Sequence, residues 1–200
     1  MDKVITTRQK ILNESALLFS QNGYKATSVR MIARAVGVKE SALYNHFENK
    51  EQIYKEVLSS IMKPVFSLDS SDITTQALKG KLFLSSFATK YKLMTFDRGS
   101  DESFRLLLIE LLQNPTLREH FLEDSHGASL KYLSMAFFTM MQNNLIRSTD
   151  PNILAYQFFS TLFYIRLHIT LMRLDHKNSN DLSRLFEKHV EAFWELIVLS

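Results

Sequence analysis

Apolar residues recur three and four positions apart along most of this chain, which is the spacing of one face of an α-helix. In the first 62 residues, capping and turn residues divide the pattern into short stretches. Thr6 with Gln9 forms a capping box, and Asn22-Gly23 and Gly37 tolerate the left-handed conformation that ends a helix. The predicted helices cover residues 6–22, 28–36, 39–47 and 49–62.

Longer helices are predicted for the rest of the chain, where the apolar stripes continue between fewer breaks. Asn114-Pro115 and Asp150-Pro151 each supply an N-cap residue followed by a first-turn proline. The predicted helices cover residues 70–95, 99–112, 114–145 with an interruption at Gly127, 150–174, and 178–200.

The scarcity of turn-forming residues excludes a β-rich fold. Five Gly and three Pro are 8 of 200 residues, or 4%, against an average usage of about 12%. A sandwich or a barrel needs such residues at every tight turn. We therefore predict an all-α fold.

The absence of cysteine excludes disulfides and thiolate metal sites, and it is typical of the reducing cytoplasm, where we expect this protein. The first residues are polar and charged, without the apolar core of a signal peptide. The longest apolar stretch, residues 153–172, contains Gln157, Arg166 and His168. A buried helix of a soluble protein explains this stretch better than a membrane span does.

Charge and aromatic content divide the chain near Pro64. Residues 1–63 contain 10 Lys and Arg and 6 Asp and Glu, a net charge of +4, whereas residues 64–200 contain 14 and 15, a net charge of −1. Thirteen of the 15 Phe follow residue 64. The sequence therefore predicts a small basic front part and a larger, more apolar second part.

The front part contains a helix-turn-helix pattern. Ala33, Gly37 and Leu43 stand at the spacing A-x3-G-x5-L across two short predicted helices. The small alanine lets the helices cross closely, the glycine permits the turn, and the leucine anchors the second helix. Taken alone, this spacing leaves an ordinary helical corner as an alternative.

Neighbouring motifs make the pattern more specific, and together they resemble the signature of TetR-family transcriptional regulators over residues 6 to about 62. The motifs are Leu43-Tyr44-Asn45-His46-Phe47, Asn49-Lys50-Glu51 and, before them, Ile11-Leu12, Phe19, Gly23-Tyr24, Thr27-Ser28-Val29 and Ile32-Ala33. The later residues match in length, helicity and a turn at residues 145–151. The resemblance implies a three-helix DNA-binding domain at residues 1–48, a connecting helix at 49–63, and an effector-binding and dimerisation domain at 64–200.

The resemblance also implies which side chains contact DNA, because the family inserts its third helix into the major groove. Phosphate contacts are expected from Thr27, Ser28, Arg30, Tyr44, Asn45, His46 and Lys50, and base contacts from Lys39, Glu40, Ser41 and Ala42. Many relatives have a Ser cap followed by Lys and Gly where this chain has Lys39-Glu40-Ser41, so the operator sequence is not predicted. Core packing of Tyr44 and simple solvation of His46 or Lys50 remain alternatives, whereas Phe47 is assigned to the core.

Two apolar stripes in the last helices are expected to form a four-helix bundle with a second copy, because the family dimerises in this way. The predicted interface residues are Phe158, Leu162, Ile165, Ile169, Met172, Leu182, Leu185, Phe186, Phe193 and Ile197. Periodicity alone is explained equally well by a core within one chain. A two-fold dimer would present two reading helices to successive major grooves of a palindromic operator.

Large apolar side chains of the second part are candidates for an effector pocket, although plain core packing explains any one of them better. The candidates are Phe83, Phe87, Tyr91, Met94, Phe104, Leu108, Phe121, Tyr132, Met135, Phe138 and Tyr164. The polar residues nearest these stripes are Arg105, Glu110, Gln157, Arg166 and His168. They do not fix the charge of a ligand.

No motif predicts an enzyme, a cofactor or a metal. The sequence lacks a glycine-rich phosphate loop, a nucleophile elbow and paired catalytic carboxylates. His120, Asp124 and His126 have a spacing that a metal could use, but surface histidines explain them better.

The sequence hypothesis is a homodimeric TetR-like repressor that binds a palindromic operator in double-stranded DNA and is released by a small-molecule effector. The helix at residues 49–62 would transmit the change between the two parts. One alternative is a DNA-binding protein of the same fold without an effector, either nucleoid-associated or regulated by a partner. A second is an all-α enzyme or ligand carrier with a vestigial helix-turn-helix.

Overall fold

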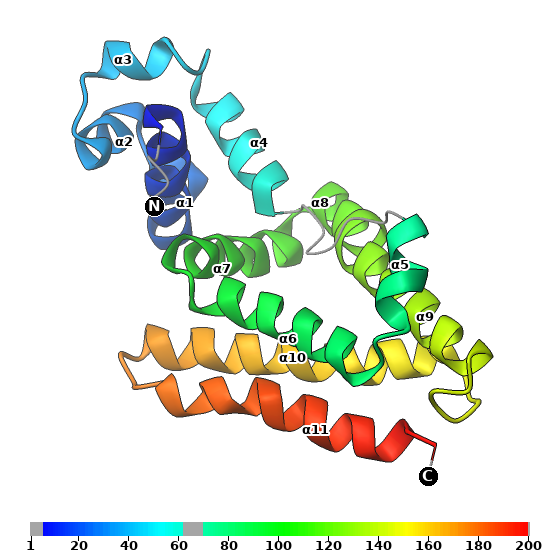
Figure 1. Cartoon of the computed structure of the whole chain (residues 1–200). Coiled ribbons are helices and arrows are strands. Elements are labelled where there is room, and N and C mark those ends of the chain that lie inside the picture. Colours follow the sequence, from blue (N-terminus) through cyan, green and yellow to red (C-terminus); the bar gives the residue numbers. More distant parts are fainter. Residues whose placement is uncertain (1–5, 62–69, 200) are drawn as a thin grey trace. The chain divides into compact units, whose positions relative to one another are not determined.

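The computed structural model describes residues 6–61 and 70–199, and their regular elements are helices (Figure 1). The predicted all-α fold, with an N-terminal helix-turn-helix and a larger helical part after it, is confirmed. The elements are α1 (Thr7–Ala26), α2 (Val29–Val36), α3 (Glu40–Tyr44), α4 (Lys50–Ile61), α5 (Ser70–Ala77), α6 (Lys81–Phe96), α7 (Arg98–Gln113), α8 (Pro115–His120), the π-helix η1 (Phe121–His126), α9 (Gly127–Gln142), α10 (Pro151–Leu174), the 3₁₀-helix η2 (Asn180–Arg184) and α11 (Leu185–Ile197).

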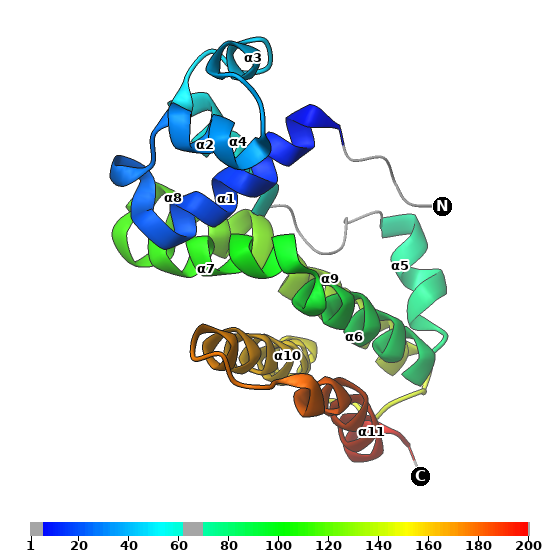
Figure 2. The same ribbon diagram turned by 90° about the vertical axis from the view of Figure 1, so that its left-hand side faces the viewer.

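The chain forms two compact units that do not follow its order. The first unit combines residues up to 63 with residues 97–120, and the second combines residues 64–96 with residues 121–200. Within the first unit, α1 packs against both α4 and α7 (Figure 2). Helices α7 and α8 therefore belong to the same compact unit as the helix-turn-helix. The predicted functional division at residues 48 and 63 stays a prediction.

Local capping explains where the helices of the first unit begin and end. The Thr6 Oγ1 atom accepts a hydrogen bond from the Gln9 N–H at 3.2 Å, which is one of the two bonds of the predicted capping box, and the Gln9 side chain donates to Asn13 Oδ1 at 2.9 Å. Gly23, at φ +78°, ends the regular part of α1, and Gly37, at φ +79°, ends α2. Helix α3 is shorter than predicted, and Lys39 before it supplies no side-chain cap.

The predicted continuous helix over residues 70–95 is wrong, because the chain breaks between α5 and α6. Gly80 adopts a left-handed conformation at φ +55°, which interrupts the helical hydrogen bonds. An ideal Cβ at this position would lie 2.9 Å from Cη2 of Trp194 on α11. Glycine thus allows both the turn and the close approach of an aromatic ring.

Gly127 acts differently from the predicted interruption. The chain stays helical from η1 into α9, and η1 is wound as a π-helix. A Cβ on Gly127 would lie 2.2 Å from the carbonyl oxygen of Leu122, five residues earlier. Only glycine fits this wide turn, so the residue permits the π-helix instead of ending a helix.

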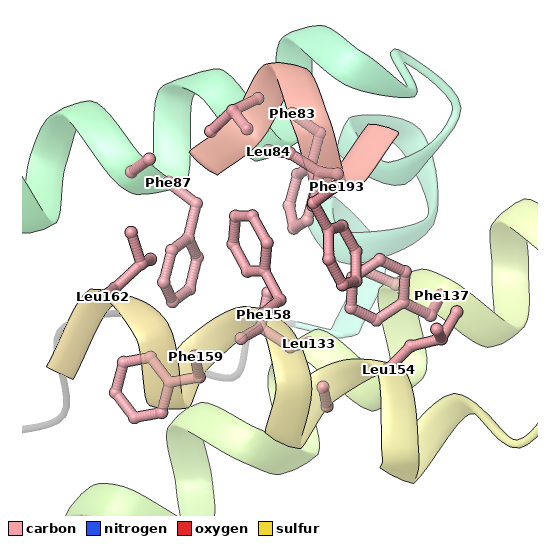
Figure 3. Close-up of a cluster of buried hydrophobic side chains, with 14 of the residues drawn as sticks. Phe83, Leu84, Phe87, Leu133, Phe137, Leu154, Phe158, Phe159, Leu162 and Phe193 are labelled. Carbon is pink, nitrogen blue, oxygen red and sulfur yellow. The ribbon is translucent and has the colours of Figure 1, made fainter. Parts of the chain in front are cut away.

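The core of the second unit is aromatic and joins α6, α9, α10 and α11 (Figure 3). The Phe158 ring is fully buried, and its centroid lies 6.0 Å from that of Phe87, 6.2 Å from that of Phe137 and 5.2 Å from that of Phe193. These rings meet in tilted or edge-to-face pairs, the favoured geometry for aromatic side chains. Ring packing therefore accounts for the many Phe of this part.

This core contains most of the residues that sequence reasoning assigned to a subunit interface. Phe158, Leu162, Ile165, Ile169, Phe186, Phe193 and Ile197 are buried within the single chain, Met172 and Leu182 are half-buried, and Leu185 is exposed. The buried side chains are already covered by α6 and α9 and by each other, so they are core residues here. Periodicity could not separate these two uses of an apolar stripe.

Candidate nucleic-acid interface

Helices α2 and α3 meet as the helix-turn-helix spacing predicts. Ala33 and Leu43 are buried at the crossing, and the N–H of Gly37 donates to the carbonyl oxygen of Ala33 at 3.0 Å. The Oγ of Ser28 accepts from the Met31 N–H at 3.2 Å and thereby caps α2. The apolar sides of both helices thus face the unit's core and their polar sides face outward.

Most predicted DNA contacts lie on this outward side. The exposed ones are Ser28, Arg30, Lys39, Glu40, Ser41, Tyr44, Asn45 and His46, and Ala42 is half-buried. They follow one another along α2, α3 and the turn after α3. Tyr44 is 55% exposed, which argues against core packing of its ring, whereas Phe47 is buried as predicted.

Thr27 is the exception, because its side chain is only 1% exposed. Its Oγ1 lies 2.9 Å from the carbonyl oxygen of Gly23 and 3.2 Å from that of Leu18. The hydroxyl proton is therefore used by a carbonyl oxygen of α1 and is not available to a phosphate. Ser28 keeps its hydroxyl proton available, since its Oγ acts as an acceptor in the cap.

Lys50 connects the start of α4 to the end of α1. Its Nζ donates to the carbonyl oxygens of Tyr24 and Thr27, both at 2.8 Å, and lies 4.2 Å from the centroid of the Tyr24 ring. A cation suits this place, because carbonyls at a helix end carry partial negative charge. Two of the three ammonium protons are used, which leaves one for a phosphate.

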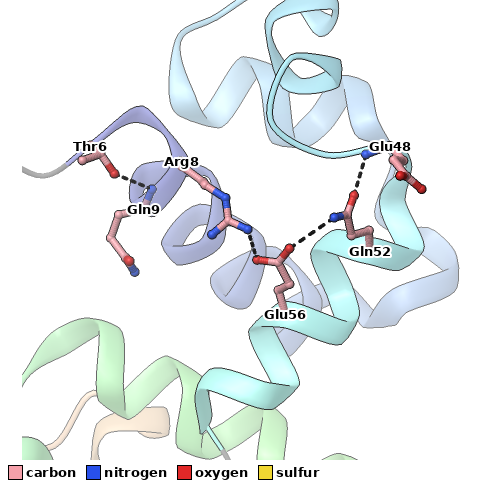
Figure 4. A network of polar contacts seen from close by, with 6 residues as sticks. All are labelled: Thr6, Arg8, Gln9, Glu48, Gln52 and Glu56. Atoms are coloured by element: carbon pink, nitrogen blue, oxygen red, sulfur yellow. Dashed lines mark hydrogen bonds and ion pairs between the residues drawn. The ribbon is translucent and has the colours of Figure 1, made fainter.

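A second polar network joins α1, α4 and the turn after α3 (Figure 4). Arg8 pairs with one carboxylate oxygen of Glu56, and Gln52 Nε2 donates to the other at 3.4 Å. Gln52 Oε1 accepts from the Glu48 N–H at 2.6 Å. Sequence reasoning missed Arg8 and Glu56, whose 48-residue separation leaves no local signal.

Phe19, Tyr24 and Tyr54 form an aromatic cluster in the first unit, and Lys50 contacts its Tyr24 ring. The Tyr54 ring centroid is 4.6 Å from that of Tyr24 and 5.2 Å from that of Phe19. The Tyr54 hydroxyl is hydrogen-bonded to the Glu110 carboxylate on α7, and burial, followed by this bond, raises the pKa of Tyr54. Glu110, considered above as a polar group near a pocket, is thus part of the unit that contains the helix-turn-helix.

The candidate effector residues do not gather in one place. Phe83, Phe87, Tyr91 and Tyr132 are buried in the second unit, Phe104 and Leu108 belong to the first, Met94 and Phe121 are half-buried, and Tyr164 is 63% exposed. Met135 and Phe138 line an open groove of about 320 Å³ between α5 and α9. The other lining residues are Ile73, Thr74, Ser134, Thr139 and Pro151.

His126 of η1 lies among aromatic rings of the second unit. Its ring stacks on Phe121 at 5.4 Å between centroids and lies 5.2 Å from Phe159 and 6.1 Å from Phe163. Burial lowers the pKa of His126, so this ring stays neutral over a wider pH range than a solvated histidine. π-Helical turns are frequent at functional sites.

Helices α10 and α11 also carry exposed apolar side chains, on faces other than the buried stripes. They are Ile153, Tyr156, Tyr164, Leu171 and Leu174 on α10, and Leu185 and Leu196 on α11. A second copy that packed against these helices would meet these side chains and not Phe158.

Residues 6–61 and 70–199 contain neither a cluster of metal-ligating side chains nor a membrane-spanning helix. No three His, Asp or Glu side chains there lie close enough together to hold a metal ion. None of the helices there is both long and apolar enough to cross a membrane.

Comparisons with known proteins point to one family. The sequence model described as "Bacterial regulatory proteins, tetR family" matches residues 11–57. The HTH-type transcriptional repressor KstR2 of Mycolicibacterium smegmatis is 38% identical over 85 residues, which are 40% of this chain and 41% of KstR2. The chain thus matches about two fifths of the length of that relative.

Two other similarities extend further along the chain. The biofilm operon icaADBC negative transcriptional regulator IcaR of Staphylococcus epidermidis is 27% identical over 150 residues, 74% of this chain and 72% of IcaR. The solved structure of a SmeT–triclosan complex is 16% identical, with a TM-score of 0.67 over 97% of this chain and 92% of that chain. At this identity the structural similarity shows a shared fold.

Proposed function

Because the chain belongs to the TetR family of bacterial regulatory proteins, we propose that it is a homodimeric transcriptional repressor that binds a palindromic operator and is released by a small molecule. The observation that carries the proposal is the exposed polar surface formed by α2, α3 and the turn after α3, with Arg30, Tyr44 and His46 among its residues. Such a surface suits a phosphate backbone and a major groove. Its place of action would be the cytoplasm, where bacterial DNA lies.

Dimerisation is supported by the exposed apolar residues of α10 and α11. Tyr164 and Leu196 are 63% and 72% exposed in the single chain. Burial of a large apolar side chain stabilises an assembly by roughly 1.5–3 kcal/mol, so several of them together favour a second copy. Two-fold symmetry would then present two α3 helices to one face of the DNA.

Effector binding is supported by the SmeT–triclosan complex of the same fold and by the apolar second unit. A ligand that binds the DNA-free arrangement of the dimer more tightly than the DNA-binding arrangement would lower operator affinity. The change can be no larger than the ratio of the ligand's affinities for these two arrangements. Such coupling usually amounts to about 1–3 kcal/mol, or roughly 5- to 150-fold in affinity. Native mass spectrometry of the purified protein would identify a retained ligand.

The experiment that tests the proposal is selection of bound fragments from random-sequence DNA. A palindromic motif is expected. Arg30→Ala should then weaken binding to every fragment and lower the salt dependence by about one counterion, since one phosphate contact is lost. Lys131→Ala is the matched control, because Lys131 is an exposed cation on α9 of the second unit.

Three outcomes would contradict parts of the proposal. Failure to enrich any motif would exclude sequence-specific DNA binding and favour a ligand carrier. An enriched motif whose affinity no retained ligand changes would favour an effector-free DNA-binding protein. Equal salt slopes for Arg30→Ala and Lys131→Ala would remove Arg30 from the DNA contacts.

A further inference from the structure

The polar network of Figure 4 ends at Glu48 in the turn after α3, and Arg8 of this network also contacts the preceding residue, Phe47. The backbone N–H of Glu48 donates to Gln52, and the Arg8 guanidinium lies 4.8 Å from the ring centroid of Phe47. Both branches meet at the Glu56 carboxylate, which accepts from Arg8 on one oxygen and from Gln52 on the other. Residues 47 and 48 are thus held from α1 and from α4 at once.

The donor and acceptor groups of this network determine which side chains can occupy its positions. The Glu48 N–H is a donor and needs the Gln52 carbonyl oxygen, whereas the Glu56 carboxylate accepts only and needs the Gln52 NH₂. An amide is the side chain that serves both ends. A leucine at position 52 would lose both bonds, and a glutamine at position 56 would lose the charge that attracts Arg8.

The anchored residues directly follow the expected DNA contacts. The N–H groups of His46 and Phe47 both donate to the carbonyl oxygen of Leu43 at 2.9 Å, so hydrogen bonds fix the turn to the end of α3. Phe47 is buried, whereas Tyr44, Asn45 and His46 are exposed. A shift of residues 47 and 48 would therefore move the three exposed side chains relative to the rest of the unit.

We infer that Gln52 and Glu56 are positioning residues, which together with Arg8 hold segment 44–46 in the geometry that meets DNA. The inference rests on the proposed function, since it assigns these side chains a role at the same interface. None of the three needs to touch DNA for this role. Their effect passes through the Glu48 N–H and the Phe47 ring.

A change in the charge of Glu56 distinguishes a positioning role from a purely electrostatic one. Glu56→Gln removes one negative charge from the unit that would meet DNA. An electrostatic role predicts tighter binding to all DNA, because a repulsion is lost. A positioning role predicts weaker binding to the selected fragment and no weakening on unrelated DNA. The two roles thus predict opposite signs for the selected fragment.

Glu51→Gln is the matched control. Glu51 lies on the same helix, is exposed, and pairs with Lys55 four residues further along α4. The substitution changes the charge by the same amount and leaves the network of Figure 4 intact. Both variants replace an exposed or half-exposed carboxylate by an amide of similar shape, so folding should be preserved.

The first measurement needs no DNA. Amide hydrogen exchange of residues 45–49 is expected to be roughly tenfold faster in Glu56→Gln and in Gln52→Leu than in the wild type, because an anchored turn opens more often when its bonds are lost. Glu51→Gln should exchange like the wild type. Equal exchange in all four proteins would overturn the inference, whether or not the protein binds DNA.

The second measurement uses the fragment selected from random DNA by the wild type, and an unrelated fragment of equal length. Glu56→Gln is expected to bind the selected fragment about 5- to 10-fold more weakly and the unrelated fragment no more weakly. Tighter binding of both fragments, as expected for Glu51→Gln, would overturn the inference. If the wild type selects no fragment, the proposed function fails, and hydrogen exchange alone decides whether the network holds the turn.

Discussion

Replacing Phe158 with alanine should remove the side chain at the centre of the second unit's core. The ring is fully buried and has three Phe neighbours within 6.2 Å, and the His189 ring stacks on it at 5.1 Å between centroids. A buried Phe→Ala change costs about 3–5 kcal/mol through lost transfer free energy and the cavity left behind. Because aromatic pairs add about 0.5–1.5 kcal/mol beyond burial, we expect a loss near 4–5 kcal/mol.

Urea unfolding, followed by the fluorescence of the single tryptophan, Trp194 on α11, measures this loss. Phe158→Leu keeps much of the side-chain volume and provides a milder variant that should still fold. The control is Leu196→Ala, whose side chain is exposed on α11. Sedimentation equilibrium of the same variants measures self-association separately from the stability of the fold.

The expected results distinguish a core residue from a residue of the subunit interface. At protein concentrations at which the chain is monomeric, Phe158→Ala should lower the free energy of unfolding, and Leu196→Ala should change it by less than about 1 kcal/mol. Self-association should be weakened by Leu196→Ala and not directly by Phe158→Ala. A Phe158→Ala protein as stable as the wild type but with weaker self-association would refute the assignment of Phe158 to the core. It would restore Phe158 to the subunit interface that the family resemblance implies.

Two further predictions concern Gly80 and His189. Gly80→Ala should lower the free energy of unfolding by about 1–3 kcal/mol in urea titrations, because of its positive φ and the nearby Trp194 ring. Gly37→Ala is the control, because Gly37 also has a positive φ but no atom lies within 4 Å of the new Cβ. This control measures the cost of backbone strain without a side-chain clash. Equal losses would contradict a contribution from Trp194. Burial lowers the pKa of His189 despite its bond to the Phe158 carbonyl, so the unfolded state, with a histidine pKa of about 6.5, binds more protons. The contribution of His189 to stability should therefore be complete above about pH 6.5 and decrease as the pH falls toward the pKa of the folded state. The His189→Gln variant should lose less stability than the wild type between about pH 7 and 5. Equal losses in the two proteins would exclude His189 as the cause.

Much of the local structure could be predicted because its causes are local. The side chain of Asp150 accepts from the Asn152 N–H at 2.8 Å, and Pro151 occupies the first turn of α10. Asn114 caps α8 in the same way through the Leu117 N–H. The bond partners lie two or three residues from the cap, so residue types and spacing are enough to predict them.

The remaining features depend on contacts between distant parts of the chain. Gly80 breaks a helix whose apolar periodicity runs on through the break, and its Trp194 neighbour is 114 positions away. Lys50 was expected to contact a phosphate, but the sequence contains no sign that its ammonium would also bind Tyr24 and Thr27 carbonyls. Such pairings are determined by how the helices pack, which composition and spacing do not specify.

The make-up of the first compact unit has a consequence for synthesis on the ribosome. Helices α1 and α4 pack against α7, which is translated only after the intervening segment of the second unit. At about 5–20 residues per second, residues 64–120 take roughly 3–11 s to add. During this interval the nascent helices lack the neighbour that covers them and are open to chaperones or to non-native contacts. The helix-turn-helix is thus made first but must wait for residue 120 before its own unit can be complete.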